Sequence, residues 1–188
     1  MKIALIVIGV IVIIAIAIGG WMIGGLNHVV RLDEVVNSSW AQVDNQLQRR
    51  NDLVPNLVNT VKGYASHEKG LLTEVTELRS QWGRAATKEQ KMENANQMSS
   101  AISRLLLVAE NYPDLKANQN FLALQSQLEG TENRIAVERM RYNNSVKMFN
   151  AYRRTVFGGF FASMRGLDQP REYFKAPENA KAVPVVKF

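Results

Sequence analysis

The chain contains no cysteine among its 188 residues, and it has only two histidines, His28 and His67. A disulfide, a cysteine-ligated zinc and a thiolate nucleophile are therefore excluded. His67 and Glu68 begin like the helical motif of zinc proteases, but Leu71 stands where that motif needs its second histidine. No glycine-rich phosphate loop and no serine nucleophile elbow is present. These absences favour a protein that is not an enzyme and predict no cofactor and no metal site, while hydrolysis by carboxylates that meet only in three dimensions stays open.

Charged residues are missing from residues 3–30, and residues 3–26 are almost wholly apolar side chains and glycine. As a helix, residues 3–26 would measure about 36 Å, enough to cross a hydrocarbon core of about 30 Å. Trp21 suits the membrane interface. We interpret residues 1–27 as an uncleaved transmembrane anchor.

A cleaved signal peptide is the alternative, because Ala15-Ile16-Ala17 has the small-x-small pattern of a cleavage site, although it lies inside the apolar run. Gly20 and Gly24 would let two such helices approach closely. Lys2 and Arg31 flank the run on opposite sides, so the positive-inside rule leaves the side of the membrane open.

A heptad pattern follows the anchor. From Val36 to Trp82, apolar or aromatic residues recur at alternating steps of four and three, which is typical of the seam of a long packed helix. We predict one long helix that ends near Gly83. Pro55 should kink it, with Asp52 capping the restarted helix.

Two further helices are predicted, over residues 88–110 and 115–164, separated by a turn at residues 111–114. The last carries a seven-residue repeat from Phe121 to Val156 and should bend at Gly158-Gly159. The predicted fold is therefore all-α, with an N-terminal transmembrane helix, an antiparallel long-helix bundle over residues 28–166, and an extended tail over residues 167–188.

Charged residues occupy positions in the apolar row of the first long helix and flank the row of the last. Because isolated buried charges are costly, they should pair across the bundle and fix its register. A polar functional site or a contact between subunits is the alternative. The residues are Arg50 and Glu68 on the first long helix, and Glu132, Glu138, Arg139 and Arg153 on the last.

Basic residues concentrate in residues 134–165, where Glu138 is the single acidic residue. This segment accounts for the whole net charge of +6. Such a segment can contact anionic lipid headgroups or a partner protein, or it is an ordinary solvated face. Nucleic acid is not expected, because the aromatic residues lie in the apolar row. The candidate contact residues are Arg134, Arg139, Arg141, Lys147, Arg153 and Arg154.

Several joined motifs occur in order along the chain. They are Arg49-Arg50-Asn51-Asp52-Leu53-Val54-Pro55, Tyr64-Ala65-Ser66-His67-Glu68, Glu110-Asn111-Tyr112-Pro113-Asp114, Thr131-Glu132-Asn133-Arg134-Ile135 and Arg141-Tyr142-Asn143. With these motifs the chain resembles the LemA family of bacterial membrane proteins.

The resemblance implies a single N-terminal helix in the bacterial inner membrane, a long-helix bundle, no enzyme activity, and roles in membrane organisation or beside membrane-bound proteases. One departure is visible, since Gly158-Gly159 follow Phe157 where the family usually has proline.

Two functions are compatible with these patterns. The first is a non-catalytic scaffold that self-associates through its bundle on the lipid bilayer, which makes a homo-oligomer the expected state. The second is a regulatory adaptor that holds a membrane protein partner, such as a protease, against residues 50–52 or the basic segment. An enzyme would need a polar cleft that the sequence does not reveal.

Overall fold

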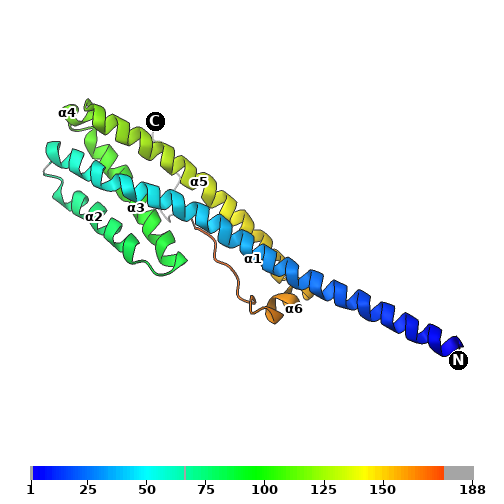
Figure 1. Cartoon of the computed structure of the whole chain (residues 1–188). Helices are drawn as coiled ribbons and strands as arrows, with labels where there is room; N and C mark the ends of the chain where they lie inside the picture. Colours follow the sequence, from blue (N-terminus) through cyan, green and yellow to red (C-terminus); the bar gives the residue numbers. More distant parts are fainter. Residues whose placement is uncertain (1, 66, 176–188) are drawn as a thin grey trace, which may run out of the picture. The chain divides into compact units, whose positions relative to one another are not determined.

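The computed structural model describes residues 2–65 and 67–175, and every regular element in these ranges is a helix. Figure 1 shows their course along the chain. The all-α prediction, with a long apolar helix at the N-terminus, is confirmed. The helices are α1 (Lys2–Tyr64), α2 (Lys69–Arg84), α3 (Lys88–Ala109), α4 (Pro113–Lys116), α5 (Gln119–Arg153) and α6 (Val156–Met164).

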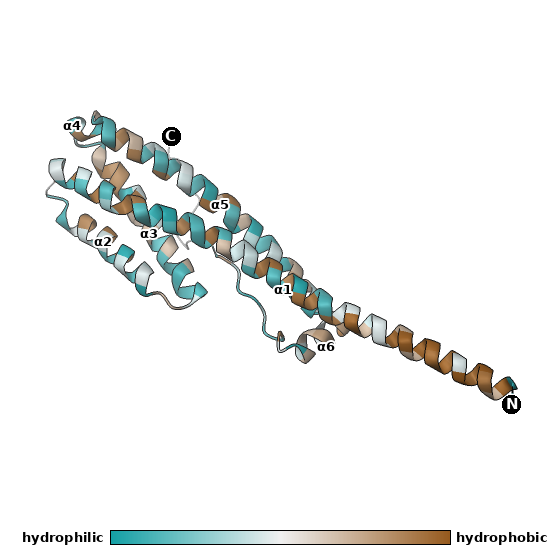
Figure 2. Ribbon diagram, viewed as in Figure 1, coloured by the Kyte–Doolittle hydropathy of each residue, from teal (hydrophilic) through white to brown (hydrophobic). Residues whose placement is uncertain are grey.

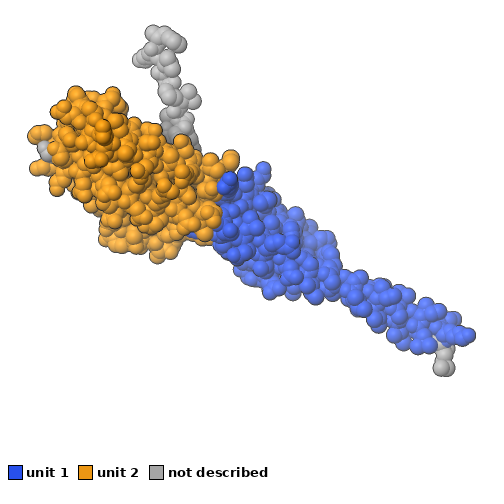
Figure 3. Space-filling view, turned by 45° about the horizontal axis from the view of Figure 1, so that its top comes forward, with its two compact units in different colours: residues 1–40, 141–173 blue, residues 41–140, 174–188 orange. Residues whose placement is uncertain are grey.

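The chain divides into two compact units, coloured separately in Figure 3. Unit 1 consists of residues 1–40 and 141–173, and unit 2 of residues 41–140 and 174–188. Residues 167–175 contain no helix, and the rest of the predicted tail, residues 176–188, lies outside the described residues.

The N-terminal part of α1 is a candidate membrane span. It is long and apolar enough to cross a bilayer, and its most apolar stretch is not buried against any other part of the structure. Figure 2 shows this stretch as a nearly continuous hydrophobic segment. Its side chains are exposed because no other described segment packs on them, which is the arrangement a lipid environment stabilises.

Unit 2 is a bundle in which residues 41–64 of α1 pack with α2, α3 and the first half of α5. The heptad residues Val54, Leu57 and Val61 are buried with apolar residues of the other helices, including Val75, Met98, Leu105 and Phe121. A capping box begins α3, where the hydroxyl of Thr87 accepts a hydrogen bond from the Gln90 backbone N–H and the Gln90 side chain accepts one from the Thr87 backbone N–H. Burial of these apolar stripes provides the main stabilisation of the bundle.

The prediction of one rod from Val36 to Gly83 is wrong. The first helix ends at Tyr64 and α2 begins at Lys69, so the last part of the heptad row, from Leu71 to Trp82, lies on a separate helix. Val75, Leu78 and Trp82 are nevertheless buried, as the pattern requires. An apolar row specifies which residues face the core, but the same row fits one long helix or two helices that share a core.

The predicted restart of the helix at Pro55 is also wrong, since α1 runs through this proline as one helix. Proline has no backbone N–H, which leaves the carbonyl of Asn51 without its helical donor. Arg79 of α2 supplies a replacement, with its Nε donating to the Asn51 carbonyl at 3.3 Å. Asp52 does not cap a helix, and its carboxylate accepts a hydrogen bond from the Gln48 side chain at 2.9 Å.

The last predicted helix, residues 115–164, is interrupted before Gly158-Gly159 and not at these glycines. The fifth helix ends at Arg153, and α6 starts at Val156. Thr155 caps α6, since its hydroxyl accepts a hydrogen bond from the Gly158 N–H at 3.0 Å. The seven-residue repeat therefore stops at Phe149, which is buried, and Val156 is 85% exposed.

Polar contacts hold residues 167–173 against the helices of unit 1. The Arg171 guanidinium donates to the Asp33 carboxylate at 2.6 Å, and the Asn150 side chain exchanges two hydrogen bonds with the Arg171 backbone, at 2.8 and 2.9 Å. The Tyr142 hydroxyl donates to the Glu172 carbonyl at 2.9 Å. These backbone contacts explain why a segment without apolar periodicity has a defined path.

Gly25 of α1 provides the space in which α6 docks. A Cβ built on Gly25 would lie 2.1 Å from a ring carbon of Phe161, whereas a Cβ on the neighbouring Gly24 would meet nothing within 4 Å. The two glycines are adjacent on one helix, so they form a matched pair for mutation.

We expect Gly25→Val to displace α6 and to destabilise its docking by about 1–3 kcal/mol, because the added carbons overlap the Phe161 ring. Limited trypsin digestion in mild detergent measures this as faster cleavage at Arg154 and Arg165, which flank α6. Gly24→Val is the control and should be cleaved at the rate of the unchanged chain. Equal rates for the two variants would contradict the assigned role of Gly25.

Candidate functional site

A buried arginine occupies the centre of unit 2. The side chain of Arg50 on α1 is 0% exposed, and its guanidinium contacts α3 and α5. Nη1 donates to the Ser99 hydroxyl at 2.8 Å and to the Glu132 carboxylate at 2.9 Å, and Nη2 donates to the Ala95 carbonyl at 3.1 Å. The Ser99 hydroxyl lies 3.1 Å from the second oxygen of Glu132. Three helices are thus joined by one charged group.

A second guanidinium adds positive charge to this cluster. The pKa of Arg139 on α5 is lowered to about 10, chiefly by burial and then by the charge of Arg50, while Glu132 opposes the shift. Burial also lowers the pKa of Arg50, against the raising effect of Glu132. Both arginines stay protonated at neutral pH. The Arg139 guanidinium lies 4.0 Å from the centroid of the Phe174 ring, a cation–π contact that partly replaces lost hydration.

Hydrogen-bonding capacity remains unused around Arg50. Several buried polar atoms have no hydrogen-bond partner among the described residues. They are Nε of Arg50, Nε and Nη2 of Arg139, and both side-chain polar atoms of Asn51. Asn94 donates to the Leu78 carbonyl at 2.9 Å, but its own side-chain oxygen has no partner. One carboxylate therefore faces two buried guanidinium groups, which makes Glu132 the most consequential acidic group of the cluster.

Two other predicted polar residues have their described contacts elsewhere. Glu68 accepts a long hydrogen bond, 3.4 Å, from the Tyr112 hydroxyl. The Arg153 guanidinium donates to the Asp168 carbonyl at 2.7 Å. Glu138 and Arg141 each have an interaction partner.

The predicted basic contact residues differ in their exposure. Arg134, Lys147 and Arg154 are exposed, whereas Arg139 is half-buried beside Arg50. Their spacing distributes them around the helix. A contact of Arg134, Arg139, Arg141, Lys147, Arg153 and Arg154 with lipid or a partner stays a prediction.

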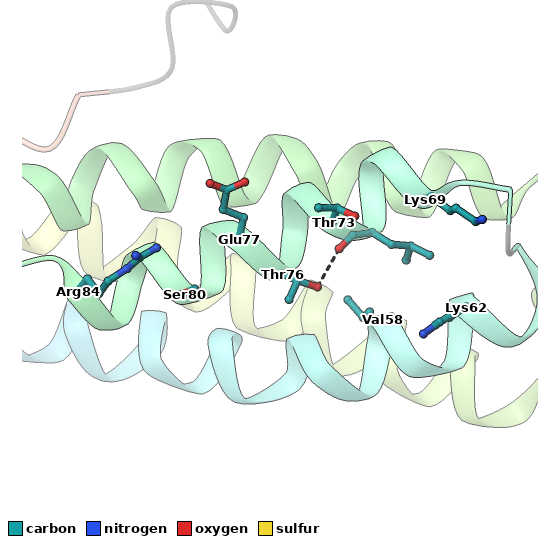
Figure 4. A pocket seen from close by; sticks show the side chains of 9 residues that line it. Val58, Lys62, Lys69, Thr73, Thr76, Glu77, Ser80 and Arg84 are labelled. Carbon is teal, nitrogen blue, oxygen red and sulfur yellow. Dashed lines mark hydrogen bonds between the residues drawn. The ribbon is translucent and has the colours of Figure 1, made fainter.

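An open groove of about 670 Å³ lies along α1 and α2 (Figure 4). Val58 and Leu72 contribute apolar surface, Thr76 donates to the Leu72 carbonyl at 2.8 Å, and lysine and arginine side chains outnumber the single carboxylate. The sequence did not reveal this groove, because it forms only when two helices fold back on each other. It is lined by Val58, Lys62, Lys69, Leu72, Thr73, Thr76, Glu77, Ser80 and Arg84.

Sequence reasoning also missed Ser99 and Phe174 as partners of the cluster, and Asn94 as a buried polar residue. Asn94 is a polar residue beside the buried Ala95 on α3, and this exception to the apolar pattern was the available signal. Phe174 had no signal, because it follows a stretch without periodicity. In the described part of the chain, no group of three or more histidine, aspartate or glutamate side chains could hold a metal ion.

These features define a class of protein, a helical bundle whose first helix begins with a candidate membrane span. The comparisons with known proteins identify the family. The model of the LemA family matches residues 39–188, and the chain belongs to this family, as its motifs predicted. The chain is similar to Protein LemA of Metamycoplasma hominis, with 24% identity over 130 residues, which are 69% of this chain and 59% of that relative. The chain thus spans less than two thirds of the length of the relative that it matches.

Proposed function

We propose that the protein is a non-catalytic scaffold, anchored in the bacterial inner membrane by α1, that self-associates through its helical bundle. The exposed apolar part of α1 carries the proposal of membrane anchoring. The side chains of its most apolar stretch are not buried against any other described part of the chain, and transfer of such a helix into hydrocarbon is strongly favourable.

An exposed apolar row on α5 supports self-association. Within unit 2, Leu122, Val137 and Met140 are 48%, 43% and 59% exposed. Their helical spacing places them on one face, since Val137 and Met140 are three apart and Leu122 lies about four turns earlier at a similar angle. Apolar residues aligned on one helix face are typical of a surface that packs on another chain. A second copy would present the same row, as a two-fold interface requires.

We expect the full-length chain in mild detergent to have a discrete mass of several copies, and Val137→Glu with Met140→Glu to reduce this mass to that of one chain. Buried carboxylates facing each other across the interface would be desolvated and would repel. The measurement is light scattering after gel filtration, at several protein concentrations. Asn120→Glu with Gln127→Glu adds the same charge at exposed positions on a different face of α5 and should keep the high mass.

A monomer at every concentration would overturn self-association. It would favour the second candidate function, a regulatory adaptor for another membrane protein such as a membrane-bound protease. The groove along α1 and α2 favours this alternative, because apolar surface edged by Lys62, Lys69 and Arg84 suits an acidic amphipathic segment of a partner. A high mass that both double variants retain would place the contact outside the α5 row.

A further inference from the structure

Helix α6 has apolar residues on two opposite faces. Its nine residues, Val156–Met164, contain no charged side chain. A helix that is apolar on all sides is normally buried all round. Within residues 2–65 and 67–175, one face of α6 is covered, by α1, and the other is exposed.

The covered face of α6 packs on the end of the apolar part of α1. Phe161 fills the space left by Gly25, and its ring lies 5.1 Å from that of Trp21, measured between centroids. Phe157 approaches Trp21 edge-on at the same centroid distance, with an interplanar angle of 90°. These contacts fix α6 beside residues 21–25 of α1.

The opposite face of α6 is exposed over its whole length. Val156, Phe160 and Met164 follow the spacing i, i+4 and i+8, so they share one side of the helix, and Phe157, which contacts Trp21, lies at the border between this side and the covered face. The helical register separates this side from Phe161 and Ala162, which are buried. The exposed residues are Val156 at 85%, Phe157 at 61%, Phe160 at 51% and Met164 at 52%.

The position of α6 along α1 matches one edge of a bilayer. A hydrocarbon core of about 30 Å takes up about 20 helical residues, so a span beginning near Ile3 ends near Trp21 and Met22. Tryptophan prefers this boundary. Arg154 and Arg165 are exposed at the two ends of α6, where long basic side chains reach headgroup phosphates.

We propose that α6 is a second membrane contact, whose exposed face enters the phospholipid bilayer at the boundary between headgroups and acyl chains. The proposal rests on the membrane anchoring of α1 proposed above, and the occupant of this face is lipid. Continuity with the apolar surface of α1, aromatic rings at the expected depth, and flanking cations all point to it. An interfacial helix of this kind enters by about 5–10 Å.

Single-cysteine labelling tests the proposal on the full chain, because the natural sequence has no cysteine. Phe160→Cys and Met164→Cys would each carry an environment-sensitive fluorophore, in vesicles of phosphatidylcholine and phosphatidylglycerol. Ile13→Cys reports on the proposed span, and Asn144→Cys, an exposed position on α5, reports on water. Spin-labelled lipid and aqueous iodide serve as the two quenchers.

We expect lipid-borne spin label to quench positions 160 and 164 several-fold more strongly than iodide does, as at position 13, with the reverse at position 144. Iodide quenching at 160 and 164, with lipid quenching kept at 13, would overturn the proposal for α6 and leave the anchor intact. Iodide quenching at position 13 would instead overturn the anchoring of α1. Protection of 160 and 164 from both quenchers would mean that protein covers this face, which also overturns the proposal.

Discussion

Replacing Glu132 with alanine is expected to destabilise the bundle of unit 2 by about 3 kcal/mol, the lower part of the range for a broken buried ion pair. The variant leaves Arg50, which is 0% exposed, and the neighbouring Arg139 without their shared carboxylate. The Glu132 side chain is itself 33% exposed, so water entering its place offsets part of the loss. The measurement is the free energy of unfolding by urea, followed by helical circular dichroism.

Glu129→Ala is the matched control for this prediction. Glu129 lies one turn before Glu132 on α5, is exposed, and accepts a hydrogen bond only from the neighbouring Gln125 among the contacts described here. Its removal should change the free energy of unfolding by no more than about 0.5 kcal/mol. If Glu132→Ala had an effect as small as that of Glu129→Ala, the carboxylate would not be compensating the buried guanidinium groups.

Placing two arginines in the middle of the apolar segment, with Ile13→Arg and Ala17→Arg, is expected to remove the protein from the membrane. Each arginine near the centre of a membrane helix costs about 2.5–3.5 kcal/mol of insertion free energy, and the two together about 5–7 kcal/mol. Alkaline extraction of membranes measures the result as a shift of the full-length chain to the soluble fraction.

A matched variant with Ile13→Leu and Ala17→Leu keeps the segment apolar and should stay in the membrane fraction. Retention of the double-arginine variant in that fraction would mean that residues 3–26 are not what holds the chain there. The side of the membrane does not enter this comparison, so it applies to either orientation.

The apolar patterns predicted the helices of this fold well, and they were weak only at helix ends. The positions Val54, Leu57, Val75 and Trp82 are buried as their spacing indicated. The break between Tyr64 and Lys69 was missed because the heptad steps continue through it without a change of phase. The start of α6 was misplaced because the hydroxyl of Thr155, rather than the glycine pair, determines where that helix begins.

Individual charged residues of the candidate site could be predicted from the sequence, but most of their contacts could not. Arg50 and Glu132 were recognisable as charges within apolar rows, and the structure pairs them at 2.9 Å. Their shared hydroxyl, Ser99, could not be assigned, because serine is unremarkable on a helix surface and its role depends on how α3 is rotated. The contact of Arg139 with Phe174 joins residues from a helix and an aperiodic segment, for which no spacing rule exists.

Arg79 of α2 donates to the Asn51 carbonyl, which Pro55 leaves without its helical donor. This contact ties the formation of α1 to the docking of α2. The Asn51 carbonyl cannot be satisfied within its own helix, and its donor, Arg79, lies 28 positions further along the chain. During folding, this carbonyl keeps its water until α2 docks. The turn of α1 around Pro55 is therefore completed by tertiary structure rather than by local helix propagation, which makes the two helices one cooperative folding unit.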